Sequence, residues 1–365
     1  MMILKNLSLK HFRNYDFLDL TFGENVNIIY GQNAQGKTNI VEAIHFLSFS
    51  KSFRTNTDSD AVKFGKDTAY IKGKVISNLP YTIDVRISSS RKKAVNVNSV
   101  PIQKISDLMG VLSTVVFVPE DVKIVSDSPR YRRNFLDKEI SQLKPVYYNV
   151  LSDYTKLLKN KNLLLKNEKV DLDLLDIYDE QLASAMEKIT NYREKFTKKL
   201  ADIASKIHLK ISSNKEQLSL NYKSDIPAHT KPDIANHLRS VRKQDIFMRT
   251  SSSGIHKDDI EIKIGDTDLR KYGSQGQKKT AVAAIKLSEI DLIESESGSS
   301  PVVILDDIFS ELDNLRKNAI IDYLKKSQVF ITTATPINDT SEFSDIKYFH
   351  VSDGKVEIKN NMFYT

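Results

Sequence analysis

Apolar and polar residues follow two different rhythms along this chain, and the rhythm changes several times. Between Met2 and Phe22 every second residue tends to be apolar, which predicts two strands joined by a turn near residues 10–16. The run Val26–Tyr30 is apolar except for Asn27 and predicts a buried strand. Apolar residues at helical spacing follow at 39–47, so a strand, a loop and a helix are expected in succession.

Alternation returns at residues 81–87 and 94–97, with the basic turn Ser88–Lys93 between them. This turn either meets a DNA phosphate or is a solvated hairpin tip. The short apolar run Val115–Val118 predicts another central strand of a mainly parallel sheet.

From Tyr131 to Leu209 the chain is nearly free of glycine, and apolar residues recur every three or four positions. The polar stretch 160–173 predicts a turn between two long antiparallel helices. These helices form either a short coiled-coil-like arm or an ordinary helical subdomain. Arg130, Arg132 and Arg133 open this region and either bind DNA or pair with acids of the sheet domain.

After the helical region, strands are predicted at 218–222, 260–264, 301–307 and 329–334, with helices at 232–248, 278–294 and 314–326. The expected fold class is α/β, with a mixed, largely parallel sheet, flanking helices and an antiparallel β region. We expect three segments: an N-terminal part of one domain (1–127), an inserted helical arm lobe (128–248), and the C-terminal part of the first domain (249–365).

Composition limits the kinds of site the protein can contain and its expected location in the cell. The 365 residues include no cysteine, so disulfides and thiolate metal sites are excluded. No apolar run approaches the length of a membrane span, and the N-terminus lacks a signal-peptide core, so a cytoplasmic location without membrane contact is expected. The net charge of +7 permits nucleic-acid binding without requiring it.

The strongest chemical motif is the phosphate-loop pattern G-x-x-x-x-G-K-[ST] between the predicted strand and helix. Its glycines let backbone N–H groups surround a phosphate, and the helix N-terminus adds partial positive charge. Lys37 is expected to reach the β- and γ-phosphates of ATP, and Thr38 to bind Mg²⁺. The predicted nucleotide-binding residues here are Gly31, Gln32, Asn33, Ala34, Gln35, Gly36, Lys37, Thr38 and Asn39. Arg13 and Asn14, in the preceding turn, either contact the base or ribose or form a polar hairpin turn.

A second anion site is predicted where Ser274, Gln275, Gly276 and Gln277 precede a long helix. The phosphate held by the first loop already has its own helix, so this site suits a phosphate presented by another subunit. A simple helix cap is the alternative for this motif taken alone.

The strand 301–307 ends in two carboxylates. In a P-loop ATPase the first, Asp306, binds Mg²⁺, and the second, Asp307, activates the attacking water. The segment Ser310–Asp313 is expected to contact a facing subunit, and Thr332 or Thr333 to lie near the γ-phosphate. His256, in a loop, is either a site residue or structural.

Taken in order, these motifs resemble the ABC-type ATPase heads of the SMC family, and within it the bacterial recombination mediators. The resemblance covers nearly the whole chain. Besides the motifs above, it includes the segments 9–15, 51–55, 253–259 and 305–313. Transporter ATPases lack the helical insertion, and SMC proteins proper have far longer coiled coils.

The resemblance implies a protein that binds ATP and Mg²⁺ and forms an ATP-dependent head-to-tail homodimer, in which Ser274 of one subunit caps the γ-phosphate held by Lys37 of the other. It implies binding to double-stranded DNA and to gapped or single-strand/double-strand junction DNA, weak DNA-stimulated ATPase activity used as a switch, and action with RecR and RecO in loading recombinase.

Three features depart from the family pattern. Asp307 stands where many such heads carry Glu, which suits slow turnover. Ala34 stands where many relatives have Gly, which requires a negative φ, and threonine stands at the place of the transporter switch histidine. Two other functions remain open: an ATPase head serving a transporter or nuclease complex, and a monomeric P-loop small-molecule kinase.

Overall fold

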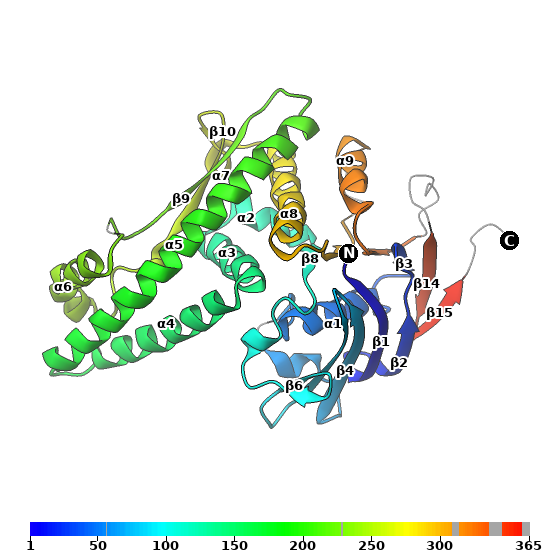
Figure 1. Cartoon of the computed structure of the whole chain (residues 1–365), viewed down its shortest axis with the longest axis horizontal. Coiled ribbons are helices and arrows are strands. Elements are labelled where there is room, and N and C mark those ends of the chain that lie inside the picture. Colours follow the sequence, from blue (N-terminus) through cyan, green and yellow to red (C-terminus); the bar gives the residue numbers. More distant parts are fainter. Residues whose placement is uncertain (56, 228, 309–313, 336–344, 360–365) are drawn as a thin grey trace. The chain divides into compact units, whose positions relative to one another are not determined.

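The computed structural model describes residues 1–55, 57–227, 229–308, 314–335 and 345–359. The chain divides into two compact units (Figure 1). Unit 1 contains Met1–Asp121 and Lys286–Thr365, and unit 2 contains Val122–Ile285. The two ends of the sequence therefore build one unit, and the middle of the chain is inserted into it.

Unit 1 contains an antiparallel sheet of six strands in the order β2-β1-β4-β5-β6-β7. The strands are β1 (Ile3–Phe12), β2 (Tyr15–Thr21), β4 (Thr68–Ile76), β5 (Pro80–Ser88), β6 (Ala94–Val97) and β7 (Val100–Pro101). Along β4 and β5, buried and more exposed residues alternate, because one face of the sheet packs on the core and the other faces solvent. The predicted strands and the turn between β5 and β6 are confirmed.

The second sheet of unit 1 also has six strands, in the order β15-β14-β3-β13-β12-β8. They are β3 (Val26–Tyr30), β8 (Thr114–Phe117), β12 (Val302–Asp306), β13 (Val329–Thr333), β14 (Ile346–Ser352) and β15 (Lys355–Lys359). All pairings are parallel except that of β15 with β14. The mixed, largely parallel sheet expected from the sequence is confirmed.

Strand β8 corrects one expectation. We expected it to be a central strand, but it lies at the edge of the sheet and pairs with β12. All four of its residues are nevertheless buried. Helix α1 (Lys37–Phe49) covers it, and His45 and Ser48 of α1 contact Thr114 at 3.2 and 2.8 Å. Continuous apolar character therefore indicated burial of both faces, not a central place in the sheet.

Helix α1 packs against strands of both six-stranded sheets. Its apolar side chains join one core with β1, β4 and β5 of the first sheet and with β12, β13 and β14 of the second. Eleven of its residues are buried, including Lys37 and Glu42. Because α1 is enclosed on all sides, the loop that precedes it is held at a fixed place. Unit 1 also contains η1 (Asp58–Ala61), η2 (Ile105–Asp107) and α9 (Asn314–Leu324).

Unit 2 is mainly helical. Its long helices are α3 (Pro129–Leu143), α4 (Pro145–Leu164), α5 (Leu172–Ile211) and α6 (Lys231–Met248), accompanied by the short helices α2 (Lys123–Ser126), α7 (Leu269–Tyr272) and η4 (Ile255–Lys257). The segment η3 (Pro119–Val122) lies at the boundary of the units. Helix α8 (Gln275–Ser297) runs from unit 2 into unit 1.

The two predicted long helices are α4 and α5, and they pack on each other (Figure 1). The turn between them is shorter than expected, because α4 continues to Leu164. Lys161 is buried there, with its Nζ 2.9 Å from Asp179 Oδ1 of α5 and 2.8 Å from Asp245 Oδ2 of α6. These ion pairs and a small apolar cluster around Leu175 fasten the ends of the three helices together.

The inserted unit extends beyond the predicted boundary at residue 248, to Ile285. The reason is a three-stranded sheet of β9 (Leu218–Lys223), β10 (Asp259–Ile264) and β11 (Thr267–Asp268). Strand β9 packs on α5 and pairs along its length with β10, which follows the predicted boundary. Strand pairing between distant segments therefore carries the unit past residue 248.

Arg193 of α5 connects the helices of unit 2 to the segment before β10. Its guanidinium is almost fully buried, and it donates to Asp258 Oδ2 at 2.7 Å, to the Ile255 carbonyl at 2.8 Å and to Asp137 Oδ1 at 2.8 Å. Arg132 pairs with Asp259 at 2.5 Å. The sequence left two possibilities for the arginine group, DNA binding and pairing with acids of the sheet domain. Arg132 pairs with an acid, but that acid lies within unit 2 itself.

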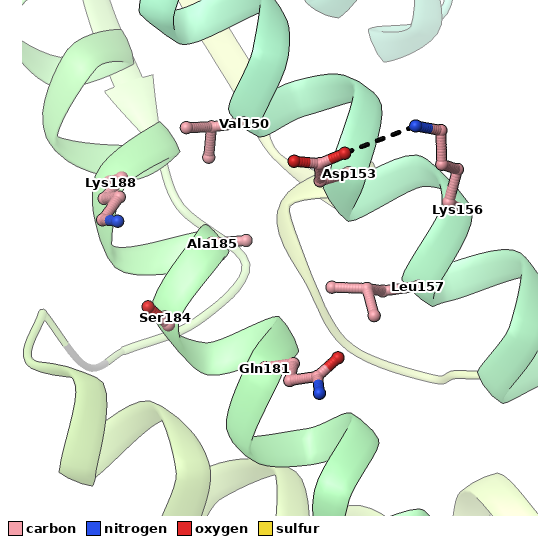
Figure 2. A pocket seen from close by; sticks show the side chains of 8 residues that line it. All are labelled: Val150, Asp153, Lys156, Leu157, Gln181, Ser184, Ala185 and Lys188. Atoms are coloured by element: carbon pink, nitrogen blue, oxygen red, sulfur yellow. Dashed lines mark hydrogen bonds and ion pairs between the residues drawn. The ribbon is translucent and has the colours of Figure 1, made fainter.

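A groove of about 460 Å³ lies between α4 and α5. Figure 2 shows the side chains that line it: Val150, Asp153, Lys156 and Leu157 of α4, and Gln181, Ser184, Ala185 and Lys188 of α5. Lys156 Nζ lies 3.4 Å from Asp153 Oδ1 of the same helix. None of the residues predicted to form a site lines this groove.

Candidate nucleotide site

The predicted phosphate loop connects β3 to α1, as the sequence indicated. Two glycines are required by its geometry. Gly36 has φ +115°, and a Cβ there would lie 2.6 Å from Asn14 Nδ2 and 2.8 Å from the Tyr15 hydroxyl. Gly31 has φ +150°, and a Cβ there would lie 2.2 Å from the Val351 carbonyl oxygen. The loop therefore closes tightly against the β1–β2 turn and against β14.

Ala34 has φ +66°, in the left-handed region. The expectation that this position has a negative φ is wrong. Alanine adopts such a φ only at a cost that glycine avoids, so the loop carries local strain that the surrounding contacts hold in place.

Lys37 lies inside the loop and is 4% exposed. Its Nζ donates to the carbonyl oxygens of Gly31 at 2.7 Å and Gln32 at 2.9 Å. Burial lowers the pKa of this ammonium, while the charges of Asp307 and Asp306 act in the opposite direction. The loop thus holds a buried cation at the N-terminus of α1, where an anion is favoured.

The ends of β12 and β13 bring together the predicted metal ligands. Asp306 is 7% exposed and accepts hydrogen bonds from Thr38 Oγ1 at 3.0 Å and from Thr332 Oγ1 at 2.6 Å. Asp306 and Thr332 are register partners in the parallel pair β12–β13. Burial raises the pKa of Asp306, and the two hydroxyl groups partly offset this effect.

These donors fit a magnesium ion. Mg²⁺ prefers a hydroxyl and one or two carboxylates together with phosphate oxygens, and Thr38 and Asp306 supply such a pair. In the described part of the chain, no three His, Asp or Glu side chains gather in a way that would hold a metal by themselves. A magnesium ion here would therefore depend on the phosphates of a nucleotide for its other ligands.

Asp307 follows directly and leaves the strand with φ +53°. Its backbone N–H donates to Thr332 Oγ1 at 2.9 Å. Thr332 thus fixes both members of the acidic pair: it donates to Asp306 and accepts from Asp307. The sequence named Thr332 and Thr333 as equivalent candidates, and only Thr332 joins this network, whereas Thr333 Oγ1 donates to the Thr335 carbonyl.

Arg13 and Asn14 lie in the turn between β1 and β2. Asn14 Nδ2 donates to the Gln35 carbonyl of the phosphate loop at 3.0 Å, and its Oδ1 accepts from Asn39 Nδ2 at 2.8 Å. Arg13 forms a bidentate pair with Glu42, with Nη2 to Oε1 at 2.5 Å and Nε to Oε2 at 2.9 Å. Both residues therefore hold the loop and α1, and their contact with a base or ribose stays a prediction.

Glu42 and Arg54 are parts of this site to which the sequence analysis assigned no role. Glu42 is fully buried in α1 and accepts hydrogen bonds from Arg13, Arg54 and Ser52. Arg54 Nη1 also donates to Asn39 Oδ1 at 2.8 Å, and its charge lowers the pKa of Asp306. The sequence did contain a signal for these roles: an acidic residue lies within the apolar run 40–47, and two basic residues follow at 51–54.

The second predicted anion site lies in unit 2. Ser274 Oγ accepts from the Gln277 N–H at 3.2 Å, and Gln277 Oε1 accepts from the Ser274 N–H at 3.0 Å, which is a reciprocal cap at the start of α8. Gln277 Nε2 donates to Glu216 Oε1 at 2.8 Å. Ser274, Gln275 and Gly276 are exposed. The sequence left two alternatives for this motif, a helix cap and an anion site. The loop forms the cap, and its exposure also leaves it open to an anion.

Two further predictions have different outcomes. Ser310–Asp313, expected to contact a facing subunit, lies outside the described residues. His256 lies in η4, and its Nδ1 is 2.7 Å from the Tyr154 hydroxyl within unit 2. This contact gives His256 a structural partner.

A phosphate loop followed by an enclosed helix, an acidic pair at the end of an adjacent strand and a helical insertion between the two halves of the domain define an ATPase head of the SMC class. The solved Smc head domain from Pyrococcus furiosus has the same fold, with a TM-score of 0.57 at 18% identity over 98% of this chain and 96% of that one. The family described as the RecF/RecN/SMC N-terminal domain matches residues 3–348.

Within that class, the most informative relatives belong to one group. The DNA replication and repair protein RecF of Clostridioides difficile is 43% identical over 97% of this chain and 98% of its own length. The RecF of Lachnospira eligens is 40% identical over 98% of this chain. A solved structure of the recombination mediator RecF with ATPrS, in the RecFOR pathway, has a TM-score of 0.91 at 36% identity and covers 98% of both chains. The chain belongs to the RecF family.

No helix in the described residues is long and apolar enough to cross a membrane.

Proposed function

We propose that this protein is an ATP-controlled DNA-binding protein of recombinational repair and replication-fork restart. The observation that carries the proposal is the network of Thr38, Asp306 and Thr332 beside the buried ammonium of Lys37. It is supported by the solved RecF structures with ATPrS and with ATP, which have TM-scores of 0.91.

In the proposed mechanism, Lys37 exchanges its bonds to the loop carbonyls for bonds to the β- and γ-phosphates. Thr38 and Asp306 would hold Mg²⁺, which would neutralise charge that develops on the phosphates. Asp307 orients the attacking water and accepts its proton. The short aspartate side chain at this position suits slow hydrolysis, as in a switch rather than a metabolic enzyme.

Ser274 of a second copy completes the site. Ser274, Gln275, Gly276 and Gln277 form an exposed helix N-terminus that can accept a γ-phosphate. ATP bound between two heads shifts the equilibrium toward the head-to-tail dimer, because the nucleotide contacts both subunits only in the dimer. Hydrolysis removes the bridging phosphate and reverses the shift.

The dimer is proposed to bind double-stranded DNA near single-strand gaps and to act with RecR and RecO in loading recombinase. The net charge of +7 is consistent with phosphate contacts that salt would weaken. The names of the relatives, DNA replication and repair protein RecF and recombination mediator in the RecFOR pathway, support this assignment.

Sedimentation velocity with ATP and Mg²⁺ tests the composite site. The unmodified protein should dimerise only with ATP, and both Lys37→Met and Ser274→Arg should stay monomeric. Lys37→Met should also lose ATP binding, whereas Ser274→Arg should keep it, since Ser274 belongs to the partner's site. Ser240→Arg, an exposed serine of α6 in the same unit, is the matched control and should dimerise normally.

The opposite result has a defined meaning. If Ser274→Arg dimerises like the unmodified protein, the loop formed by residues 274–277, which we call the signature loop, does not contact the bound nucleotide. If the unmodified protein ignores ATP but transfers phosphate to a small molecule, a monomeric P-loop kinase replaces the proposal.

A further inference from the structure

The solvent-exposed face of the antiparallel sheet in unit 1 carries aromatic and basic side chains in a continuous row. The register pairs Phe17 of β2 with Lys10 of β1, Lys10 with Tyr70 of β4, and Tyr70 with Arg86 of β5. Directly paired residues share one face of a sheet. Aromatic and cationic residues therefore alternate across four neighbouring strands, which Figure 1 shows in part as β1, β2 and β4.

Both aromatic residues are exposed to an unusual degree. Phe17 is 69% exposed and Tyr70 is 40% exposed. The residues next to them along the strands, such as Leu18 and Ile71, are buried in the core. The core thus already has its apolar face, and Phe17 and Tyr70 are additional apolar surface directed to solvent, where it costs solubility without stabilising the fold.

The charges of this face favour an anionic ligand. Within the part of the chain that the structure describes, Lys10, Lys74 and Arg86 form no ion pair, while Arg86 lies 5.7 Å from the centre of the Tyr70 ring. The two acids on the face have partners: Asp84 lies 3.5 Å from Lys72 Nζ, and Asp19 accepts from Ser8 Oγ at 2.8 Å. The basic turn Ser88–Lys93 continues this face at the end of β5, with Arg91 and Lys92 exposed.

The same face is hollowed at its other end. A depression of about 270 Å³ is lined by residues of β1, β4 and β5 that include Asn6, Lys74 and Thr82, which are register partners of one another. The aromatic row, the unpaired cations and this depression form one surface, which we call the sheet face. It is defined by Phe17, Lys10, Tyr70, Arg86, Lys74 and Asn6.

We propose that the sheet face binds single-stranded DNA. Flat aromatic rings offer stacking platforms to unstacked bases, and cations between the rings attract the phosphates. Duplex DNA does not fit this chemistry, because its bases are already stacked. The inference rests on the proposed function, because gapped DNA supplies the single strand that the sheet face would bind. The site itself needs neither ATP nor a second subunit.

The test is a fluorescence anisotropy titration of labelled oligothymidylate at low salt without nucleotide. Phe17→Ala and Tyr70→Ala should each weaken binding by roughly tenfold, the effect of losing one stacked base. Lys10→Glu with Arg86→Glu should weaken binding further and lower the salt dependence. The charge-matched control is Lys195→Glu with Lys198→Glu, two exposed lysines of α5, which should change binding much less.

Three outcomes overturn the proposal. The first is unchanged binding by both alanine variants. The second is an equal loss in the control pair, which would mean that net charge alone attracts the strand. The third is that the sheet-face variants lose binding to a duplex or to a polyglutamate peptide as strongly as they lose binding to the single strand. That result would mean that the face attracts anions in general. Because the titration contains no ATP, its result is independent of whether ATP-driven dimerisation is observed.

Circular dichroism and thermal melting of each variant accompany the titration. The replaced side chains are exposed, so folding should be unaffected, and Tyr70→Phe keeps the ring without the hydroxyl. This variant should bind like the unmodified protein if stacking is responsible. Loss of binding in Tyr70→Phe equal to that in Tyr70→Ala would contradict the stacking role.

Discussion

The phosphate loop and the signature loop at Ser274 both lie at a helix N-terminus where we propose that a phosphate binds, but they are built in opposite ways. The phosphate loop is anchored at both ends: Lys37 is buried, Gly36 lies against Asn14 and Tyr15, and β14 closes over Gly31, whereas Gln32, Asn33 and Ala34 between them are exposed. The signature loop is exposed, and its supports include its own cap, a side-chain bond from Gln277 to Glu216 and a bond from Thr280 Oγ1 to the Gly276 carbonyl.

The difference teaches how a site can be divided between two copies of a chain. A loop whose two ends are fixed is prepared to bind its ligand before any partner arrives, because the contacts that hold its ends are already made. An exposed loop with few supports offers little binding energy alone. In the proposed dimer, the phosphate loop therefore sets the affinity for the nucleotide. The signature loop sets how strongly a bound nucleotide promotes dimerisation.

The largest expected effect comes from Gly36→Ala. A Cβ at this position meets Asn14 and Tyr15 under 3 Å and forces a strained φ, so ATP affinity should fall roughly 10- to 100-fold in calorimetric titration. Ala34→Gly is the control in the same loop: it relieves a left-handed alanine and should keep the affinity. Normal affinity in Gly36→Ala would show that the loop is not rigidly enclosed.

Asp306→Asn should separate function from stability. Magnesium-dependent hydrolysis should fall by about 100-fold, since the carboxylate that would bind the ion is lost. The melting temperature should stay the same or rise, because burial raises the pKa of Asp306 and the charge is therefore costly to bury. A drop of several degrees would instead mean that the ionised carboxylate stabilises the ends of β12 and β13.

Glu216→Ala removes one side-chain support of the signature loop. Loss of the bond to Gln277 should leave ATP affinity unchanged and weaken ATP-dependent dimerisation by roughly two- to tenfold in sedimentation, the range of one hydrogen bond at a partly exposed site. Glu261→Ala, on β10 in the same unit, should have no such effect. A change in nucleotide affinity itself would contradict the division of roles.

The smallest effect concerns pH. His208 is fully buried, with Nδ1 3.0 Å from the carbonyl of Glu216, the residue that accepts from Gln277, and burial lowers its pKa from 6.5. A lowered pKa means that the unfolded chain binds more protons just below pH 6.5, so this contribution to stability is present above that pH and is lost as the pH falls toward the folded-state pKa.

The expected result is a melting temperature that falls as the pH is lowered below about 6.5. In His208→Asn, which keeps a donor near the position of Nδ1, the fall should be shallower. His256 is the second histidine of unit 2 whose pKa burial lowers, so part of the slope should remain. An identical slope in the variant would mean that His208 does not titrate in this range.

Much of the fold and site followed from local patterns. Alternation predicted the strands of the antiparallel sheet, and three- and four-residue spacing predicted α4 and α5. The phosphate loop, Ser274 and the pair Asp306 and Asp307 could be placed because each motif is contiguous and its backbone requirement is written in neighbouring residues.

What the tertiary structure alone decided depends on residues far apart in the sequence. The edge position of β8 and the extension of unit 2 past residue 248 are set by strand pairing, which a local pattern does not encode. The left-handed φ of Ala34 occurs in a loop whose ends, at Gly31 and Gly36, are held by residues distant in the sequence. The burial of Glu42 against Arg13 and Arg54, and the choice of Thr332 over Thr333, arise only when α1, β12 and β13 meet. Sequence periodicity determines which faces are buried, whereas long-range packing determines which buried polar groups form hydrogen bonds and ion pairs with each other.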